Sequence, residues 1–414
     1  MGLYSRLKLP DGFDRDLKLL LYSMASRRVV MGFLQVVRAI YFALLGFSPI
    51  TIGLLLSMST LVSAFHHITF GLLSDRFGRK PFLLLGGFFA TIRMVIFAFS
   101  TDFWLLALGQ GVGALGEGVG AGQPVVAGYI TDRTSRKQRA PVFTTLAVTN
   151  AIAATAGSLM AGLPIYFQKS LQLTVVEAHS LLFWVGTAAS ALSLLLILPL
   201  GEMKPERGGE IEVKGRLLEV KSWDVIGQFS LVRSTSGLGW GLIQSLLPLY
   251  FFMRFGVGSE TLGPIYAVTT FLSIFSYLLI PSIVKRFGDI NSLIASRLLT
   301  AGLTAAFSLT SLYPLAIALL IVFRTIILTT MPIRQSFATT IVDPEETATA
   351  IGISNFSRMT LRSIAPTVAG YMFETLSLSL PFLLGGGLIA ANAMLYQVFF
   401  KPKNKQSQDS ARQF

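Results

Sequence analysis

The chain has 414 residues, of which 52% are hydrophobic and 13% charged, and its mean hydropathy is +0.65. Soluble proteins carry roughly 25% charged residues, and a single soluble core stops growing at about 250–300 residues, so this composition excludes a soluble protein. Cysteine is absent, which excludes disulfides, thiolate catalysis and cysteine-ligated metals. Residues 1–28 have no continuous apolar segment, so we expect no cleavable signal peptide.

Apolar stretches recur along the whole chain. Stretches of about 20 residues are long enough to cross the roughly 30 Å hydrocarbon core of a bilayer. They do not alternate apolar and polar residues as barrel strands do, so they predict helices that satisfy their own backbone groups. The sequence therefore predicts an all-α membrane protein with twelve transmembrane helices, at 29–47, 50–73, 81–100, 103–130, 141–167, 180–200, 225–252, 260–284, 290–311, 314–341, 348–374 and 379–400.

The basic residues that give the net charge of +13 are distributed unevenly between the predicted loops. Most of the 34 lysines and arginines lie in the two termini and in alternate short loops, whereas the opposite side has only Lys169 and Arg254. Because basic loops stay in the cytoplasm, we expect both termini to be cytoplasmic and the protein to lie in the cell membrane. The positive charge then predicts topology, and no nucleic-acid partner is expected.

A longer polar segment divides the predicted spans into two groups of six. The segments "GFLQVVRAIYFALLGFSPITIG" and "GLIQSLLPLYFFMRFGVGSETLG" pair Gly32 with Gly241 and Gln35 with Gln244, at a constant offset. Such repeats are typical of transporters built from two similar halves. We predict an N-terminal six-helix bundle, a central cytoplasmic loop, a C-terminal six-helix bundle and a cytoplasmic tail, at 1–200, 201–222, 223–400 and 401–414.

The strongest motif is "GLLSDRFGRK", between spans two and three. Gly78 gives the short connection backbone freedom, and the basic residues suit anionic lipid headgroups. The motif resembles the G-x-x-x-D-R-x-G-R-[KR] signature of the major facilitator superfamily, and a degenerate second copy, "KRFGD", occurs at 285–289. With twelve spans in two halves, the whole chain is similar to that family, in its drug/metabolite:proton antiporter branch.

The resemblance implies a conformational latch between the two halves. In the family, the acid and the following arginine of this motif join a charge cluster on the cytoplasmic side. The implied latch residues are Gly71, Asp75, Arg76, Gly78, Arg79 and Lys80, with Asp132 and Asp343 as partners. The alternative is that the motif only anchors topology, which explains its basic residues but leaves Asp75 without a role.

Span five carries small residues at the spacing of a second motif. The sequence A-x-x-x-G-S-x-x-A-G is a degenerate form of the G-x-x-x-G-P-x-x-G-G motif of antiporters of this family, and span eleven retains its proline. Small residues at this spacing favour close helix packing, which is our preferred interpretation over an export-specific role. The predicted helix-packing residues are Ala153, Gly157, Ala161, Gly162, Pro366 and Gly370.

Eight arginines but only one well-embedded acid, Glu117, fall within the predicted spans. Ionisable groups at that depth usually face the interior of the bundle, and the family places spans one, four, seven and ten around its central cavity. We predict substrate-binding or coupling roles for Gln35, Arg38, Glu117, Gln244 and Arg324. Two alternatives stay open: Glu117 exchanges a proton, or it forms a structural bridge with Arg38 or Arg324. Other span arginines, such as Arg297, can instead extend towards the helix ends.

These features predict a secondary active transporter of a small organic solute, working by alternating access and coupled to protons. The excess of arginine favours an anionic substrate, while the 32 phenylalanines also suit a multidrug efflux antiporter for amphipathic compounds. A membrane-embedded enzyme is disfavoured because no catalytic cluster is apparent. A non-transporting receptor of the same fold is a further alternative. We expect a functional monomer in the lipid bilayer, with no cofactor and no metal.

Overall fold

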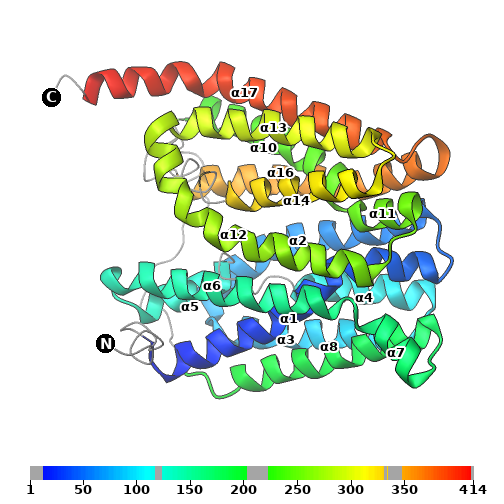
Figure 1. The fold of residues 1–414 in the computed structure, drawn as a ribbon. Coiled ribbons are helices and arrows are strands. Elements are labelled where there is room, and N and C mark those ends of the chain that lie inside the picture. Colours follow the sequence, from blue (N-terminus) through cyan, green and yellow to red (C-terminus); the bar gives the residue numbers. More distant parts are fainter. Residues whose placement is uncertain (1–12, 117–123, 203–221, 331–332, 334–346, 412–414) are drawn as a thin grey trace, which may run out of the picture. The chain divides into compact units, whose positions relative to one another are not determined.

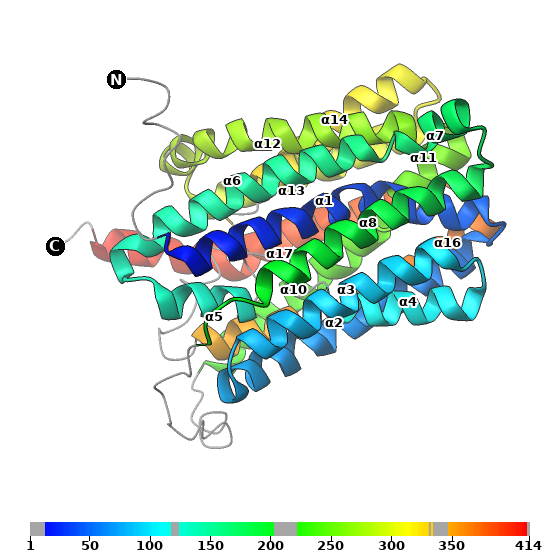
Figure 2. The ribbon, with the colours of Figure 1, turned by 90° about the horizontal axis from the view of Figure 1, so that it is seen from below.

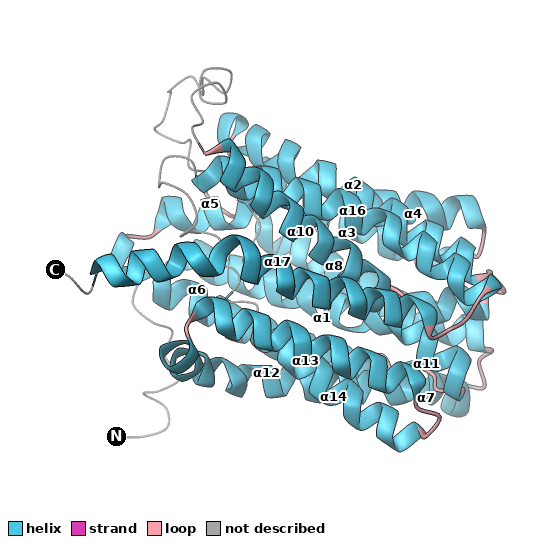
Figure 3. Cartoon of the chain, turned by 90° about the horizontal axis from the view of Figure 1, so that it is seen from above, coloured by secondary structure: helices cyan, strands magenta, loops and turns pink. Residues whose placement is uncertain are grey.

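The computed structural model describes residues 13–116, 124–202, 222–330, 333 and 347–411. Among these residues the only regular elements are helices, joined by short loops (Figures 1 and 3). In chain order they are α1 Arg15–Leu44, α2 Pro49–Phe77, α3 Lys80–Phe99, α4 Phe103–Gly116, α5 Pro124–Arg133, α6 Arg136–Met160, α7 Leu163–Leu171, α8 Val175–Ile197, α10 Trp223–Gln244, α11 Leu247–Phe255, α12 Ser259–Phe287, α13 Asp289–Leu309, α14 Tyr313–Thr329, α16 Thr347–Thr375 and α17 Leu380–Ala411.

The helices follow the predicted spans in order, which confirms the all-α membrane fold. Within the described residues, six stretches are long and apolar enough to cross a membrane: Pro49–His66, Lys80–Phe99, Lys137–Leu171, Val175–Ile197, Asp289–Leu309 and Leu380–Phe400. The helices α4 and α14 are apolar but shorter. Others, such as α1, are long but contain several charged residues, which lowers their hydropathy.

Some helices extend beyond the predicted apolar segments, because hydropathy does not detect the polar turns at a helix end. Helix α1 begins at Arg15, where the Asp14 side chain accepts a hydrogen bond from the Leu17 N–H at 2.7 Å. This N-cap satisfies one of the free donors of the first turn. At the other end of the chain, α17 continues as a helix to Ala411, beyond the predicted span.

Within the described residues, two predicted spans are interrupted. Span five is divided into α6 and α7 around Ala161 and Gly162, and span seven into α10 and α11 around Ser245 and Leu246. Pro164 and Pro248 lie at the first positions of the second helices, where a missing N–H costs nothing. The repeat-related helices α1 and α16 are continuous through the corresponding regions.

The chain folds as two compact units. Unit 1 contains Met1–Leu45, Val62–Gly209 and Gly258–Ala267, and unit 2 contains Gly46–Leu61, Glu210–Val257 and Val268–Phe414. The boundary between Gly209 and Glu210 lies in the central loop, and each unit also includes a helical segment from the other half of the sequence. Part of α2 belongs to unit 2, and the first turns of α12 belong to unit 1.

Unit 1 is built around α1, which lies between α6 and α8, with α3 packed on α8 and α4 packed on α3 (Figure 2). In unit 2, α10 packs against α16 and α17, and α13 packs against α14 and α17. The contacts of α1 with α6 and of α10 with α16 are equivalent under the repeat. At Gly32 an added Cβ would lie 2.6 Å from the Ala154 carbonyl oxygen, and at Gly241 it would lie 2.4 Å from the Ala365 Cβ.

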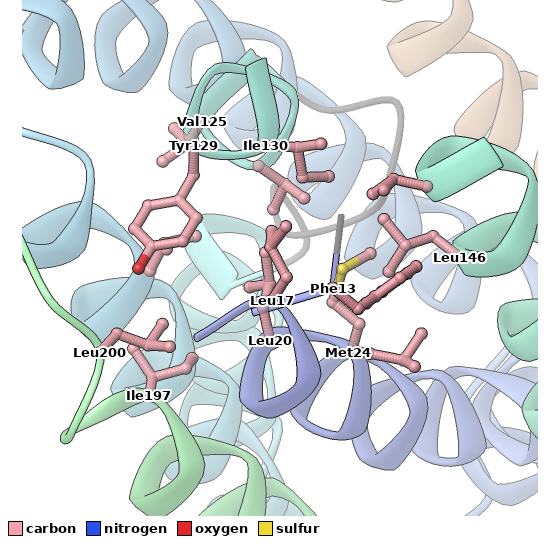
Figure 4. Packing of buried hydrophobic residues seen from close by; sticks show 14 of the residues in the cluster. Phe13, Leu17, Leu20, Met24, Val125, Tyr129, Ile130, Leu146, Ile197 and Leu200 are labelled. Carbon is pink, nitrogen blue, oxygen red and sulfur yellow. The ribbon is translucent and has the colours of Figure 1, made fainter. Parts of the chain in front are cut away.

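The end of unit 1 nearest residue 13 has its own apolar core (Figure 4). Leucines of the first turns of α1 pack there on α5 and on the end of α8. The buried residues labelled in Figure 4 are Phe13, Leu17, Leu20, Met24, Val125, Tyr129, Ile130, Leu146, Ile197 and Leu200. This core explains why α1 is helical so far outside its apolar segment.

Candidate functional site

In unit 1, the predicted site residues of α1 contact α4 and α6. The Arg38 Nη1 donates to the Gln110 Oε1 at 3.2 Å. The Gln35 Nε2 donates to the Ser158 Oγ at 3.2 Å, and the Ser158 Oγ donates to the Gly32 carbonyl oxygen at 3.3 Å. Arg38 is half-buried and Gln35 exposed, whereas Gln110 is fully buried. The two α1 residues therefore connect three helices through neutral polar groups.

Three arginines of unit 1 reach a single face of α4. Gln110, Gly113 and Gly116 are spaced three apart, which places them on one side of a helix. Besides Arg38 at Gln110, the buried Arg93 passes so close to Gly113 that an added Cβ there would lie 2.0 Å from its Cδ. Arg27 donates through Nη2 to the carbonyl oxygens of Gly86 and Gly116. The result is a row of guanidinium groups along α4.

The burial of Arg27 was not expected from hydropathy. Arg27 lies within α1, and only 7% of its surface is exposed. Hydropathy alone starts the first span at residue 29, so a buried arginine just before that point is counted as solvated. The sequence signal for this arrangement is the pair Gly113 and Gly116, because glycines on one side of α4 leave room for long side chains beside it.

In unit 2, the corresponding predicted residues also have neutral partners. The Arg362 Nη2 donates to the Gln244 Oε1 at 3.4 Å, and the Arg324 Nε donates to the buried Thr269 Oγ1 at 3.1 Å. Gln244 therefore joins α10 to α16, as its repeat partner Gln35 joins α1 to α6. Arg324 joins α14 to α12. Glu117 and Asp343 lie outside the described residues. The side chain of Asp75 and the surroundings of Gly71 also lie outside what the structure describes.

Two of the predicted latch residues, Arg79 and Asp132, lie close together within unit 1. The Arg79 Nε lies 3.5 Å from the Asp132 Oδ2, and its Nη1 donates to the Ser74 Oγ at 2.8 Å. Gly128 allows this arrangement, because an added Cβ would lie 2.4 Å from the Arg79 Cζ. Gly78 has a φ of +96°, the left-handed region that glycine adopts without strain. Arg76 is exposed over the Phe77 ring, and Lys80 begins α3.

Breaking the Arg79–Asp132 pair tests the latch. Both side chains are partly solvated, so Asp132→Asn is expected to cost no more than about 1 kcal/mol of stability. If the pair holds a transport conformation, we expect the transport rate in proteoliposomes to change severalfold while the melting temperature stays nearly constant. Asp224→Asn, in the first turn of α10, is the matched control. An unchanged rate for both variants would leave the motif with topology anchoring alone.

The predicted helix-packing residues lie at close backbone contacts. An added Cβ at Gly157 would lie 2.0 Å from the Val29 carbonyl oxygen, so α6 and α1 touch through their backbones. Ala153 is buried on the same helix, and Ala161 is buried at the C-cap of that helix. Gly162 faces Glu260, with 3.5 Å between its added Cβ and the Glu260 Cα. In unit 2, the buried Pro366 and Gly370 of α16 face Gly53 and Pro49 of α2.

These motif contacts are related by the repeat. At Gly53 an added Cβ would lie 2.2 Å from the Pro366 carbonyl oxygen, and at Gly263 it would lie 2.5 Å from the Ser158 carbonyl oxygen. Gly53 corresponds to Gly263, and Pro366 to Ser158, in the sequence repeat. In unit 2 the contact also contains hydrogen bonds from the Thr367 N–H and Oγ1 to the Ser57 Oγ, at 3.1 and 2.7 Å.

One ionic network was not predicted from the sequence. Arg133 at the end of α5 lies 2.8 Å from Asp14 and 2.6 Å from Asp16. Its Nη2 and the Tyr129 hydroxyl both donate to the Gly201 carbonyl oxygen, and the Gly201 N–H donates to Asp16 at 2.7 Å. The network connects the start of α1 with the end of α5 and with the residues after α8. The sequence separation of its members hides it from motif analysis.

Known proteins resemble the chain over most of its length. The family model described as Major Facilitator Superfamily matches residues 20–366. The uncharacterized membrane protein YJR124C of Saccharomyces cerevisiae is 19% identical over 94% of each chain. The class B tetracycline resistance protein of Escherichia coli is 34% identical, over 27% of each chain.

Solved structures show the same fold. The nucleoside transporter NupG superposes with a TM-score of 0.73 at 16% identity, over 94% of this chain and all of that one. A D-xylose–proton symporter superposes with a TM-score of 0.66 at 15% identity, over 92% and 95% of the two chains. The helical bundles, the motif at 71–80 and the extent of the family match lead to one conclusion: the chain belongs to the Major Facilitator Superfamily and is a multi-pass membrane protein of the secondary transporter class.

Proposed function

We propose that the chain is a proton-coupled secondary transporter of a small organic solute that carries an anionic group. Transport occurs by alternating access, with the N-terminal and C-terminal bundles, 1–200 and 223–400, moving against each other. The protein works as a monomer in the cell membrane with both termini in the cytoplasm. The observation that supports the substrate class is the placement of Arg38 and Arg324 within apolar spans, where the Arg38 side chain reaches α4 and the Arg324 side chain reaches α12.

A guanidinium group inside a helical bundle supplies positive charge that attracts an anionic group. Arginine also presents several donors in one plane, which matches a carboxylate or phosphate group. Gln35 and Gln244 supply further amide groups at repeat-related positions of α1 and α10. We assign proton exchange to Glu117, which directly follows the last residue of α4, Gly116.

A second candidate is a multidrug efflux antiporter for amphipathic compounds. It is favoured by the matches to tetracycline resistance proteins of three classes, which are 28–34% identical over parts of the chain. The two candidates differ in the substrate they select: organic anions in the first, uncharged or cationic amphipathic compounds in the second.

Uptake assays in proteoliposomes test both candidates. A panel of organic anions, organic cations and neutral amphipathic compounds is assayed with and without an imposed pH gradient. We expect flux of anions that depends on the gradient. Flux of cations or neutral compounds alone would favour the multidrug candidate, and flux that ignores the gradient would remove proton coupling.

Charge removal at the arginines is the matching variant test. Arg38→Gln and Arg324→Gln are each expected to lower anion transport about tenfold or more, since one charge-assisted hydrogen bond contributes about 1.5–3 kcal/mol. Arg286→Gln is the control, because Arg286 is exposed at the end of α12. Equal transport by all three variants would contradict the assigned substrate path.

Glu117→Gln separates proton exchange from a structural role. If Glu117 exchanges the proton, the variant is expected to fold normally, lose pH-driven transport and retain substrate exchange across the membrane. If Glu117 is a structural bridge, the variant is expected to lower the melting temperature and leave the pH dependence of the residual transport unchanged.

A further inference from the structure

Unit 2 buries two arginines near each other, and neither belongs to the residues assigned to the proposed substrate path. Arg297 of α13 is 4% exposed, so it does not extend to a helix end as arginines near the membrane surface do. Its Nη1 donates to the Ser236 Oγ at 3.1 Å, and its Cζ lies 5.8 Å from the centre of the Trp240 ring. Both partners belong to α10.

The second arginine comes from the same face of α10. Arg233, Ser236 and Trp240 are three and four residues apart, which aligns them along one side of the helix. Arg233 donates through Nη2 to the Asn355 Oδ1 of α16, and its Cζ lies 5.6 Å from the Phe229 ring centre. Tyr396 of α17 interacts with both guanidinium groups. Figure 1 shows α10, α13, α16 and α17, whose contacts enclose these residues.

The charges of this cluster are unbalanced. Arg233 and Arg297 repel each other electrostatically, and like charges interact strongly where the dielectric constant is low. Among the described residues, the carboxylates that form ion pairs contact only Arg79 and Arg133. The partners of Arg233 and Arg297 are an amide oxygen, a hydroxyl group and aromatic rings. Buried charges normally require a counter-charge.

The cluster also has more donors than acceptors. The Arg233 Nε and the Trp240 Nε1 are buried, and no acceptor among the described residues bonds to either. Trp240 is 7% exposed. An indole N–H and guanidinium N–H groups only donate, so an acceptor that carries negative charge would satisfy both the donors and the electrostatics.

We propose that α10, α13, α16 and α17 form a binding site for one small oxyanion, a carboxylate or a phosphate, held by Arg233, Arg297 and Trp240. Planar guanidinium groups match the paired oxygens of such anions better than they match a halide. The site lies within unit 2, and its three residues are not among those assigned to the proposed substrate path. It does not depend on which solute the protein transports.

Tryptophan fluorescence gives a direct test, because the chain has four tryptophans and the other three are exposed. In the variant Trp104→Phe/Trp184→Phe/Trp223→Phe, emission reports Trp240 alone. The purified protein is titrated in uncharged detergent by replacing sodium chloride with sodium phosphate or sodium acetate at constant ionic strength. We expect a saturable change in emission with phosphate or acetate. A linear response or no response would overturn the proposal, because it would show ionic screening or an adventitious ion only.

Substitution of the arginines supplies the second measurement. Arg233→Gln and Arg297→Gln are expected to weaken the response at least tenfold, with Arg286→Gln as the unchanged control. If a glutamine variant does not fold, Arg297→Lys retains the charge and removes the planar fork, and it is expected to reduce the preference for oxyanion over chloride. Undiminished binding in the variants that fold would overturn the site.

Two further arms separate related explanations. Short-chain phosphatidylglycerol replaces free phosphate in one titration, and a response to the lipid alone would overturn a small-anion site. Transport is measured in parallel. Loss of the Trp240 response with intact anion transport refutes only this site, whereas an intact response without transport refutes only the proposed function.

Discussion

Replacing Gly157 with leucine is expected to prevent unit 1 from folding. The backbones of α6 and α1 touch at this point, and even the first side-chain carbon would lie 2.0 Å from the Val29 carbonyl oxygen. Gly32 of α1 lies against the same surface of α6, where an added Cβ would be 2.6 Å from the Ala154 carbonyl oxygen. Overpacking a tight contact by even one or two methylenes costs about 1–3 kcal/mol, and leucine adds more than that against rigid backbone.

The measurement is the yield and melting temperature of purified protein. Gly302→Leu is the matched control, because Gly302 is also inside a helix but has no atom within 4 Å of an added Cβ. We expect near-normal yield for the control and little or no monodisperse protein for Gly157→Leu. The yield and melting temperature of Gly157→Ala should lie between those of the two leucine variants. Equal stability of the two leucine variants would show that α1 and α6 do not pack this closely.

Linking α2 to α16 through a disulfide is expected to stop transport. The Ser57 Oγ and the Thr367 Oγ1 are 2.7 Å apart, so cysteines at these positions are within reach of each other. The chain has no cysteine of its own, so Ser57→Cys/Thr367→Cys introduces the only two thiols. Alternating access requires contacts between segments of different halves to separate during each cycle. A covalent bond prevents that separation.

Transport is assayed after mild oxidation and again after reduction. We expect oxidation to lower the rate more than tenfold in the double variant and reduction to restore it. The single variants Ser57→Cys and Thr367→Cys control for the substitutions themselves and should not respond to oxidation. A cross-linked protein that transports at the original rate would show that this contact is permanent and plays no part in gating.

The sequence was sufficient to predict the fold class, the order of the helices and the family. Lipid leaves a chain few structural choices, so hydropathy and the motif at 71–80 predict the architecture well. Exact helix limits depend on local contacts that hydropathy does not record. Helix α1 begins at Arg15 because Asp14 caps it and its leucines pack on α5, and neither interaction produces a continuous apolar run.

The candidate site was predicted less completely, for a physical reason. Sequence identifies which polar residues lie in apolar segments, and it selected Arg38, Gln244 and Arg324 on that basis. It does not identify their partners, because Gln110, Arg362 and Thr269 are distant along the chain. Arg297 was considered able to reach a helix end, yet Ser236 and Trp240 hold it in the interior.

The exchanged segments of the two units have a consequence for how the halves evolve. Residues 46–61 are encoded in the first half of the chain but complete unit 2, and residues 258–267 are encoded in the second half but complete unit 1. Neither half of the gene therefore specifies a whole unit. A substitution on α16 at its contact with α2 is therefore expected to favour a compensating substitution on α2.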